Sequence, residues 1–231
     1  ISRRGLAERT RDALCPPLLP LILTLIGLIG IDPLYGIRIL NAVCFGINIF
    51  LSGALIWRMT GQRGAGLAGA FVFLISQVML EIHSWAMSEA LFISLCFGTL
   101  LTFSMYYQTR KTRWLVITAV LAGAAALSRY AGVSLIAAVG LTLLILHKPS
   151  LKEAVKAALI FGAISGGLFA AYLLGYSLAL HEWSQFGGIR FELLDEAPIR
   201  EAFYNILLWL MPGRLARGRE ILVMAGVLGL S

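Results

Sequence analysis

Five polar residues border long apolar runs of the sequence and have side chains that can bind an anion or move a proton. They are Arg38, His83, Glu89, Arg129 and Tyr130. An arginine guanidinium presents a planar fork of donors that matches the oxygens of a phosphate. A charge at membrane depth is costly, so it is usually paired or functional. If these side chains meet at one membrane face, the pattern favours a site for a phosphate-bearing lipid.

Each of these residues also has a purely structural interpretation. Arg38 and Arg129 can extend their charged heads to the membrane interface while their stems stay among apolar groups. Ser88 followed by Glu89 is also typical of an ordinary helix N-terminus, where serine caps and glutamate favours the helix dipole. His83, taken alone, is more often structural than catalytic. These interpretations remain open at the level of sequence.

The composition predicts the elements that must position these side chains. Of 231 residues, 59% are hydrophobic and 13% are charged, and a soluble domain carries about 25% charged residues. A helix that crosses a bilayer needs about 20 apolar residues. We therefore predict an all-α, polytopic transmembrane bundle with about six spanning helices, plus an interfacial helix over residues 18–31, a run too short to span. The predicted spans are residues 39–57, 64–80, 90–107, 114–128, 130–147 and 157–180, and residues 221–230 begin another.

Basic residues occupy every second connection between these runs. Arg58 and Arg63 flank one connection, and residues 110–113 and 148–156 form two more. Because basic residues are typical of cytoplasmic connections, the intervening connections are expected to face outward. Those are residues 81–89, 128–132 and 181–219. This arrangement collects the five polar residues at one outer face, and it explains the net charge of +7 without nucleic acid as a partner.

Residues 1–231 are expected to form a single transmembrane domain with residues 1–31 as part of its first outward loop. Both ends look cut, because the chain begins without Met and stops inside an apolar run. The three cysteines have no metal-ligand spacing, and we predict no metal and no required cofactor. Gly162 and Gly166 form a G-x-x-x-G pattern, which predicts a close contact between helices.

Four segments of the sequence resemble, in their order, segments of a known family. They are Pro16-Pro17-Leu18-Leu19-Pro20, Gly36-Ile37-Arg38-Ile39-Leu40-Asn41-Ala42, Ser88-Glu89-Ala90-Leu91-Phe92 and Leu127-Ser128-Arg129-Tyr130-Ala131-Gly132. They resemble the P-P-L-Y-P segment, an arginine before an L-N-A-like run, S-E-P-L-F and L-T-R-Y-x-G. The family is the GT-C class of membrane glycosyltransferases, in its bacterial branch related to protein O-mannosyltransferases and lipid A aminoarabinose transferases. Leu19 and Ala90 depart from its tyrosine and proline.

The resemblance implies transfer of a sugar from a polyprenyl- or dolichyl-phosphate carrier to an acceptor at the extracytoplasmic face. It implies that Arg38 and Arg129 hold the carrier phosphate or shape its cavity, with Glu89 beside them as an orienting acid. His83 and Tyr130 belong to the same expected substrate-binding set. The expected partners are a membrane lipid, a polyprenyl-phosphate-linked sugar donor and a glycan, lipid or protein acceptor.

The resemblance also implies a catalytic aspartate in the first outward loop. That residue is expected upstream of Ile1, after a first helix that this sequence lacks, and Asp12 has no matching context. The expected location is the bacterial plasma membrane, crossed several times.

Two other functions compete with sugar transfer. A transporter or lipid flippase would place ionisable groups near the middle of the bilayer and would show related halves, and neither feature is visible in the sequence. A non-catalytic membrane scaffold would lack an acid in its first outward loop. Sugar transfer is the interpretation that the ordered segments favour.

Overall fold

The computed structural model describes residues 16–146 and 150–180, and all regular structure in these ranges is helical. The helices are α2 (Leu18–Leu28), α3 (Pro33–Thr60), α4 (Arg63–Ile75), α5 (Gln77–Ser84), α6 (Glu89–Thr109), α7 (Thr112–Ser128), α8 (Gly132–Leu146) and α9 (Leu151–Leu180). This confirms the all-α prediction. The chain divides into residues 1–180 and residues 181–231. Asp12, the predicted loop 181–219 and the predicted start of a span at 221–230 lie outside the described residues.

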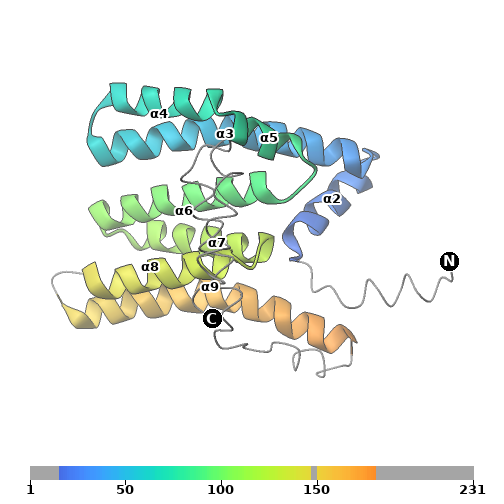
Figure 1. Ribbon diagram of the computed structural model, residues 1–231. Helices are drawn as coiled ribbons and strands as arrows, with labels where there is room; N and C mark the ends of the chain where they lie inside the picture. The colour runs from blue at the N-terminus through green and yellow to red at the C-terminus, as the bar shows by residue number, and fades with distance from the viewer. Residues whose placement is uncertain (1–15, 147–149, 181–231) are drawn as a thin grey trace, which may run out of the picture. The chain divides into compact units, whose positions relative to one another are not determined.

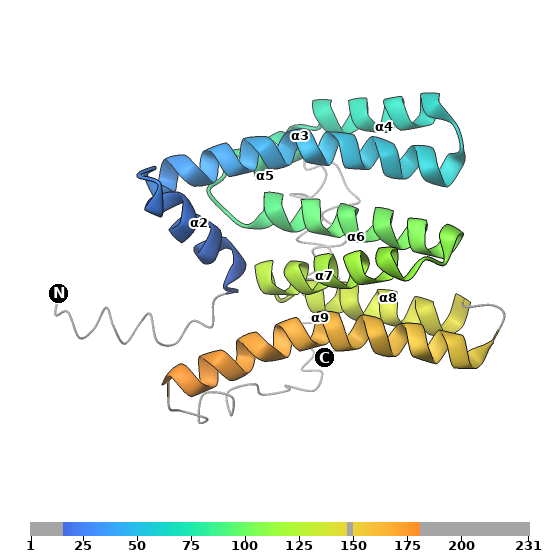
Figure 2. The same cartoon turned by 180° about the vertical axis from the view of Figure 1, so that it is seen from behind.

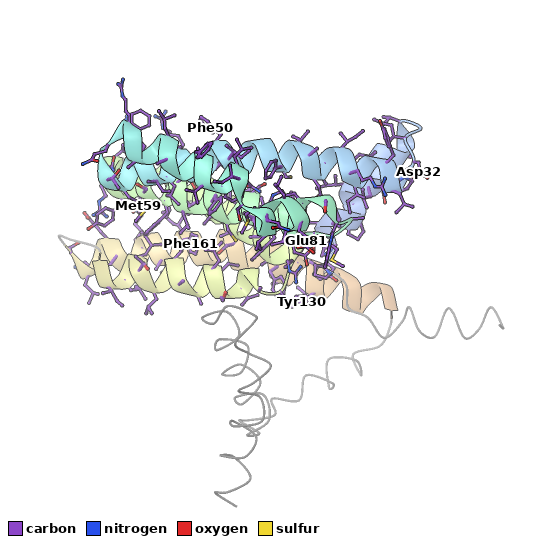
Figure 3. All side chains as sticks on the ribbon, turned by 45° about the horizontal axis from the view of Figure 1, so that its top comes forward. Asp32, Phe50, Met59, Glu81, Tyr130 and Phe161 are labelled. Carbon is purple, nitrogen blue, oxygen red and sulfur yellow. The ribbon has the colours of Figure 1, made fainter. Side chains whose placement is uncertain are left out.

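The helices of the first unit run back and forth beside one another (Figures 1 and 2). Helix α3 packs against α4 and α6, α6 packs against α7, and α7 packs against both α8 and α9. Two ends can therefore be defined. The Arg129 end is where α3, α6 and α8 begin and α7 ends; the basic end holds the α3–α4 and α6–α7 connections and the start of α9. Asp32 and Met59, at the two ends of α3, lie toward opposite sides of Figure 3.

Helix α3 shows how the sequence sets these boundaries. Asp32 caps its N-terminus, because Oδ1 accepts hydrogen bonds from the backbone N–H groups of Leu34 at 2.9 Å and Tyr35 at 3.2 Å. Pro33 occupies the first turn, where its missing N–H is not needed. The helix ends at Gly61, whose φ of 72° is left-handed and costs glycine little.

Three helices are long and apolar enough to cross a membrane, namely α3, α6 and α9, or four spans if α4 and α5 form one bent crossing. The chain is thus an integral, multi-pass membrane protein, but the predicted six spans are not shown within the described residues. Helices α7 and α8 have 17 and 15 residues. At 1.5 Å per residue they extend roughly 22–26 Å, which is less than a hydrocarbon core of about 30 Å. Helix α2 has 11 residues and is also too short.

The predicted single span over residues 64–80 is wrong in one respect, because the helix breaks at Ser76. Helices α4 and α5 meet there at a bend of 58°. Ser76 has extended backbone angles, and its Oγ accepts a hydrogen bond from the backbone N–H of Met79 at 3.4 Å. Serine competes for backbone hydrogen bonds in this way and starts a new helix.

Within residues 16–146 and 150–180, no helix makes the close contact that the G-x-x-x-G pattern predicts, because a Cβ added at Gly162 or Gly166 would meet nothing within 4 Å. The close approach lies between α3 and α4 instead. A Cβ at Gly53 would fall 2.9 Å from the backbone oxygen of Gly66, and a Cβ at Gly66 would fall 2.8 Å from that of Gly53. In lipid, burying apolar surface does not drive helices together, and small residues favour their association by letting the backbones approach closely. In this protein the two small residues at the contact come from different helices.

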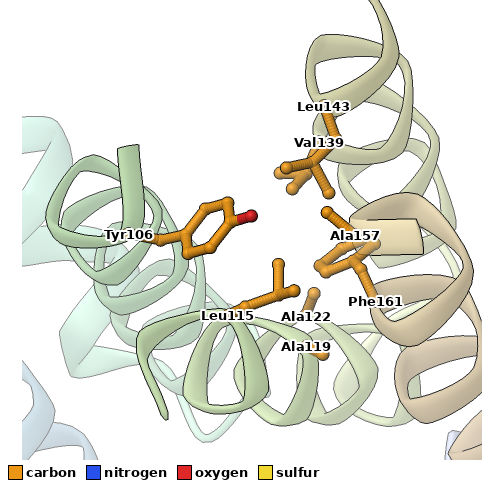
Figure 4. Packing of buried hydrophobic residues seen from close by; sticks show 8 residues of the cluster. All are labelled: Tyr106, Leu115, Ala119, Ala122, Val139, Leu143, Ala157 and Phe161. Carbon is orange, nitrogen blue, oxygen red and sulfur yellow. The ribbon is translucent and has the colours of Figure 1, made fainter. Parts of the chain in front are cut away.

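Helices α6 to α9 share an apolar core (Figure 4). Leu115, Ala119 and Ala122 of α7 meet Phe161 of α9, whose side chain is fully buried. The other members are Tyr106, Val139, Leu143 and Ala157. The alanines on α7 let the neighbouring helix backbones approach closely. This core therefore fixes the position of α7 between its neighbours, and also the position of its C-terminal end.

Candidate functional site

Arg129 and Glu89 form an ion pair at the Arg129 end. The guanidinium Nη1 donates to the carboxylate Oε1. Glu89 is the first residue of α6, and Arg129 directly follows α7. Because α6 and α7 are antiparallel neighbours, the start of one meets the end of the other. The expectation that these two residues share one end is confirmed.

The turn that carries Arg129 depends on Gly132. Helix α7 ends at Ser128 and α8 begins at Gly132, which confirms the predicted turn at residues 128–130. The Gly132 N–H donates to the Arg129 carbonyl at 2.8 Å. A Cβ at position 132 would approach backbone atoms of Ala125 and Ala126 more closely than 3.0 Å, so a larger residue would push α8 off α7. Gly132 therefore keeps the turn tight enough to hold Arg129 beside Glu89.

Both charged side chains of the pair are partly accessible. The exposed fraction of the side chain is 39% for Arg129 and 31% for Glu89. Nε and Nη2 of Arg129 have no acceptor among residues 16–146 and 150–180, and Oε2 of Glu89 is buried without a hydrogen-bond donor in that same set. Glu89 thus holds one nitrogen of the guanidinium and leaves the other donors for a further anion.

The backbone at the start of α6 only partly matches the simple helix-cap interpretation. Ser88 makes no side-chain cap hydrogen bond. Glu89 lies in the first turn, where its charge does favour the helix dipole. Its carboxylate also reaches across to Arg129, so Glu89 combines a helix-terminal role with a contact between helices.

Two buried asparagines of α3 contact the chain just before and after Glu89, and the sequence interpretation missed both. Asn41 Nδ2 donates to the carbonyl oxygen of Trp85 at 2.6 Å and of Met87 at 3.4 Å. Asn48 Nδ2 donates to the carbonyl oxygen of Ala90 at 3.2 Å. The signal was present, since two amides seven residues apart in an apolar span share one helix face and need partners in lipid.

His83 lies on α5 and is buried against α3 and α4, with 7% of its surface exposed. Its Nδ1 lies 2.7 Å from the carbonyl oxygen of Met79, an acceptor, so Nδ1 must carry the proton. Nε2 is then free to accept from Asn48 Nδ2 at 2.9 Å. The rings of Phe45 and Phe73 flank the imidazole edge-on. These contacts use both ring nitrogens and favour a positioning role for His83.

Arg38 and Tyr130 lie at the same end with different surroundings. Arg38 is exposed and precedes Asn41 by three residues, so its Cα lies one turn nearer the start of α3 on a similar side. Tyr130 is 38% exposed as a residue, and its ring meets Phe169 of α9 edge-on, with ring centroids 6.2 Å apart. Among the five predicted residues, Arg129 and Glu89 are a pair in direct side-chain contact.

The arrangement can bind an anion and hold its position. A carboxylate that holds an arginine restricts the conformations of its side chain before a ligand binds. Less conformational entropy is then lost when the guanidinium binds a phosphate, so the phosphate is bound more tightly. In residues 16–146 and 150–180, no group of three or more His, Cys, Asp or Glu side chains is placed to hold a metal ion.

Comparison with known proteins gives one result. A family model described as "Dolichyl-phosphate-mannose-protein mannosyltransferase" matches residues 15–184. That range contains every described helix and both members of the ion pair. No curated protein and no solved structure matches the chain.

Proposed function

Because the chain belongs to the dolichyl-phosphate-mannose-protein mannosyltransferase family, we propose that it transfers a sugar from a polyprenyl- or dolichyl-phosphate carrier to an acceptor on the extracytoplasmic face. Family membership supports a glycosyltransferase that uses a lipid-phosphate sugar. The observation that carries the finer proposal is the Arg129–Glu89 pair, which lies at the end away from the basic connections. Basic connections are typical of the cytoplasmic side, so the pair belongs on the outer side.

The proposed reaction exchanges one bond at the anomeric carbon. An oxygen of the acceptor bonds to that carbon while the bond from the carbon to the carrier's phosphate oxygen breaks. The acceptor's proton passes to a carboxylate base, which the family resemblance assigns to an aspartate of the first outward loop. The lipid phosphate leaves with the bonding electrons and gains negative charge.

Arg129 would stabilise that departing charge. A guanidinium held in place before the reaction needs no reorganisation as charge develops, and this lowers the barrier. Glu89 would fix the guanidinium through Oε1. Arg38 would add a second cation at the start of α3, and Tyr130 would border the same region. His83 would support the packing of α5 on α3 through its contact with Asn48.

The test measures sugar transfer from a polyprenyl-phosphate mannose by the full-length protein in bilayer nanodiscs. We expect Arg129→Ala to lower kcat/KM about 100-fold, the effect of removing one preorganised donor to a developing anion. Arg129→Lys should recover only part of the loss, since an ammonium cannot reproduce the planar fork.

The matched control is Arg113→Ala. Arg113 is also an arginine beside a helix end, but its guanidinium lies over the Trp114 ring, 5.3 Å from the centroid. Its loss should leave transfer unchanged. Equal effects of the two substitutions, or normal turnover by Arg129→Ala, would remove Arg129 from the proposed site.

The outward orientation has its own test. Single cysteines at Trp85 and at Arg113 can be labelled in intact cells with a membrane-impermeant maleimide, with Cys15, Cys44 and Cys96 replaced by alanine. Trp85 is exposed and precedes Glu89, whereas Arg113 lies in the first turn of α7 at the opposite end. Labelling at 113 and protection at 85 would reverse the orientation and contradict transfer at the outer face.

A further inference from the structure

The connection that leads into Glu89 makes few hydrogen bonds of its own. Residues 85–88 link α5 to α6 without helical structure. Within this connection, the N–H of Met87 donates to the carbonyl of Trp85 at 2.9 Å, and the Ser88 carbonyl accepts from Phe92 at 2.9 Å. The backbone direction at Glu89 is therefore set largely by contacts from outside the connection.

Asn41 supplies those contacts. Its Nδ2 donates to the Trp85 carbonyl at 2.6 Å and to the Met87 carbonyl at 3.4 Å. The side chain is 1% exposed, and Oδ1 is buried without a donor among the described residues. An amide in this setting has no water with which to exchange, so losing its bonds is expensive. The two carbonyls bracket Ala86 and stand within four residues of Glu89.

Asn41 also lies on a rigid base. Helix α3 begins at a capped N-terminus nine residues before it and packs against both α4 and α6. The same face of α3 carries Asn48, which binds the carbonyl of Ala90 on the far side of Glu89. The helix thus contacts the chain on both sides of the glutamate.

We propose that Asn41 is a positioning residue for the Arg129–Glu89 pair, holding the 85–88 connection so that the Glu89 carboxylate meets the guanidinium. The chain of contacts runs from Asn41 through the Trp85 and Met87 carbonyls to Glu89 and then to Arg129. The catalytic consequence rests on the proposed function, whereas the positioning itself can be measured without it.

The first measurement is hydrogen–deuterium exchange of the full-length protein in nanodiscs, followed at peptides covering residues 85–92. Asn41→Ala should speed exchange there by about tenfold, the factor that corresponds to losing a buried hydrogen bond of about 1.4 kcal/mol. The matched control is Ser52→Ala on the same helix, because the Ser52 hydroxyl donates to the Ile49 carbonyl of its own helix. Unchanged exchange at 85–92 in Asn41→Ala would overturn the proposal.

The second measurement is a double-mutant cycle on the binding of a polyprenyl phosphate. Asn41→Ala alone should weaken binding about tenfold, and it should have almost no further effect in a Glu89→Gln background, because residues that act through one another are not additive. A general loss of folding would instead weaken both backgrounds equally, and that additive result would overturn the inference.

The two measurements separate the inference from the proposed function. If the wild-type protein binds no polyprenyl phosphate and transfers no sugar, the proposed function fails, while faster exchange confined to 85–92 in Asn41→Ala still supports the positioning role. If the wild type binds and transfers normally but Asn41→Ala changes neither exchange nor binding, the positioning inference fails alone.

Discussion

The two ends of the helical unit both carry arginines, but these arginines have different partners. At the Arg129 end, a guanidinium meets the carboxylate of Glu89. At the basic end, guanidinium groups lie over aromatic rings: Arg110 over Tyr107 at 4.6 Å, Arg113 over Trp114 at 5.3 Å and Arg63 over Trp57 at 5.6 Å. Aromatic rings and basic residues at a membrane border are typical anchors. The partner, and not the residue type, separates an anchoring arginine from one available for chemistry.

The largest expected effect comes from breaking the turn at the Arg129 end. Gly132→Ala should lower the free energy of unfolding by about 3 kcal/mol, because the new methyl group collides with the α7 backbone. Thermal unfolding in detergent measures the loss, and polyprenyl phosphate binding should fall with it.

Gly140→Ala is the control for that substitution. Gly140 also lies in α8, but a Cβ there meets nothing within 4 Å among the described atoms. Alanine favours helix over glycine by up to about 1 kcal/mol, so this variant should be equally or more stable. Equal destabilisation by both variants would show that the Gly132 contact has no special role.

A second prediction concerns whether His83 contacts substrate or supports the helices. His83→Phe keeps a ring between Phe45 and Phe73 but removes both ring hydrogen bonds. We expect a loss of stability of about 1–3 kcal/mol, measured by thermal unfolding. At a temperature where the variant stays folded, KM for the lipid-linked donor should be unchanged.

A raised KM in His83→Phe would support the predicted place of His83 in the substrate-binding set. The control is Ser84→Ala, since the exposed Ser84 hydroxyl bonds to the Glu81 carbonyl within the same helix. That variant should change neither stability nor KM.

A third, smaller effect is expected at the basic end. Arg58 joins α3 to α6 by donating from Nε to Ser104 Oγ at 3.2 Å and from Nη2 to Gln108 Oε1 at 2.8 Å. Arg58→Met should cost about 1 kcal/mol of unfolding free energy and leave donor binding intact. If Arg58→Met lost donor binding as Arg129→Ala does, the two ends would not differ in function.

The smallest effect is expected at Arg110, which ends α6 with a left-handed φ of 53°. Arg110→Gly relieves that backbone strain, worth about 1 kcal/mol, but gives up side-chain contacts that include the Tyr106 and Tyr107 rings, each worth about 0.5–1 kcal/mol. The gain and the loss oppose each other, so thermal unfolding should shift less than in the other variants. A large destabilisation would show that the ring contact anchors this end more strongly than expected.

Much of this arrangement follows from apolar runs and from charge. The runs predict helices, and the basic clusters separate the two ends, so the meeting of Glu89 with Arg129 follows from antiparallel order alone. The bend at Ser76 did not follow, because one serine in an apolar run is compatible with a continuous helix. It becomes a break only when its hydroxyl caps α5.

Contacts between helices were predicted less well, for a physical reason. Gly162 and Gly166 fit a packing pattern, yet a Cβ at either would meet no atom of the described residues within 4 Å, whereas Gly53 and Gly66 pack closely from separate helices. A motif within one helix does not reveal which face its partner covers. Asn41 was passed over similarly, because its acceptors at Trp85 and Met87 lie 44 and 46 residues away.

The separation of Glu89 and Arg129 along the chain has a consequence for biogenesis. Glu89 leaves the ribosome forty residues ahead of Arg129. Until the second residue arrives, the first is an isolated charge at a membrane border, which is an unfavourable state. Completion of the α6–α7 hairpin neutralises both charges at once. The nascent protein therefore gains the stabilisation of the ion pair only when α6 and α7 cross in opposite directions. A chain in which either helix has the other orientation does not gain it.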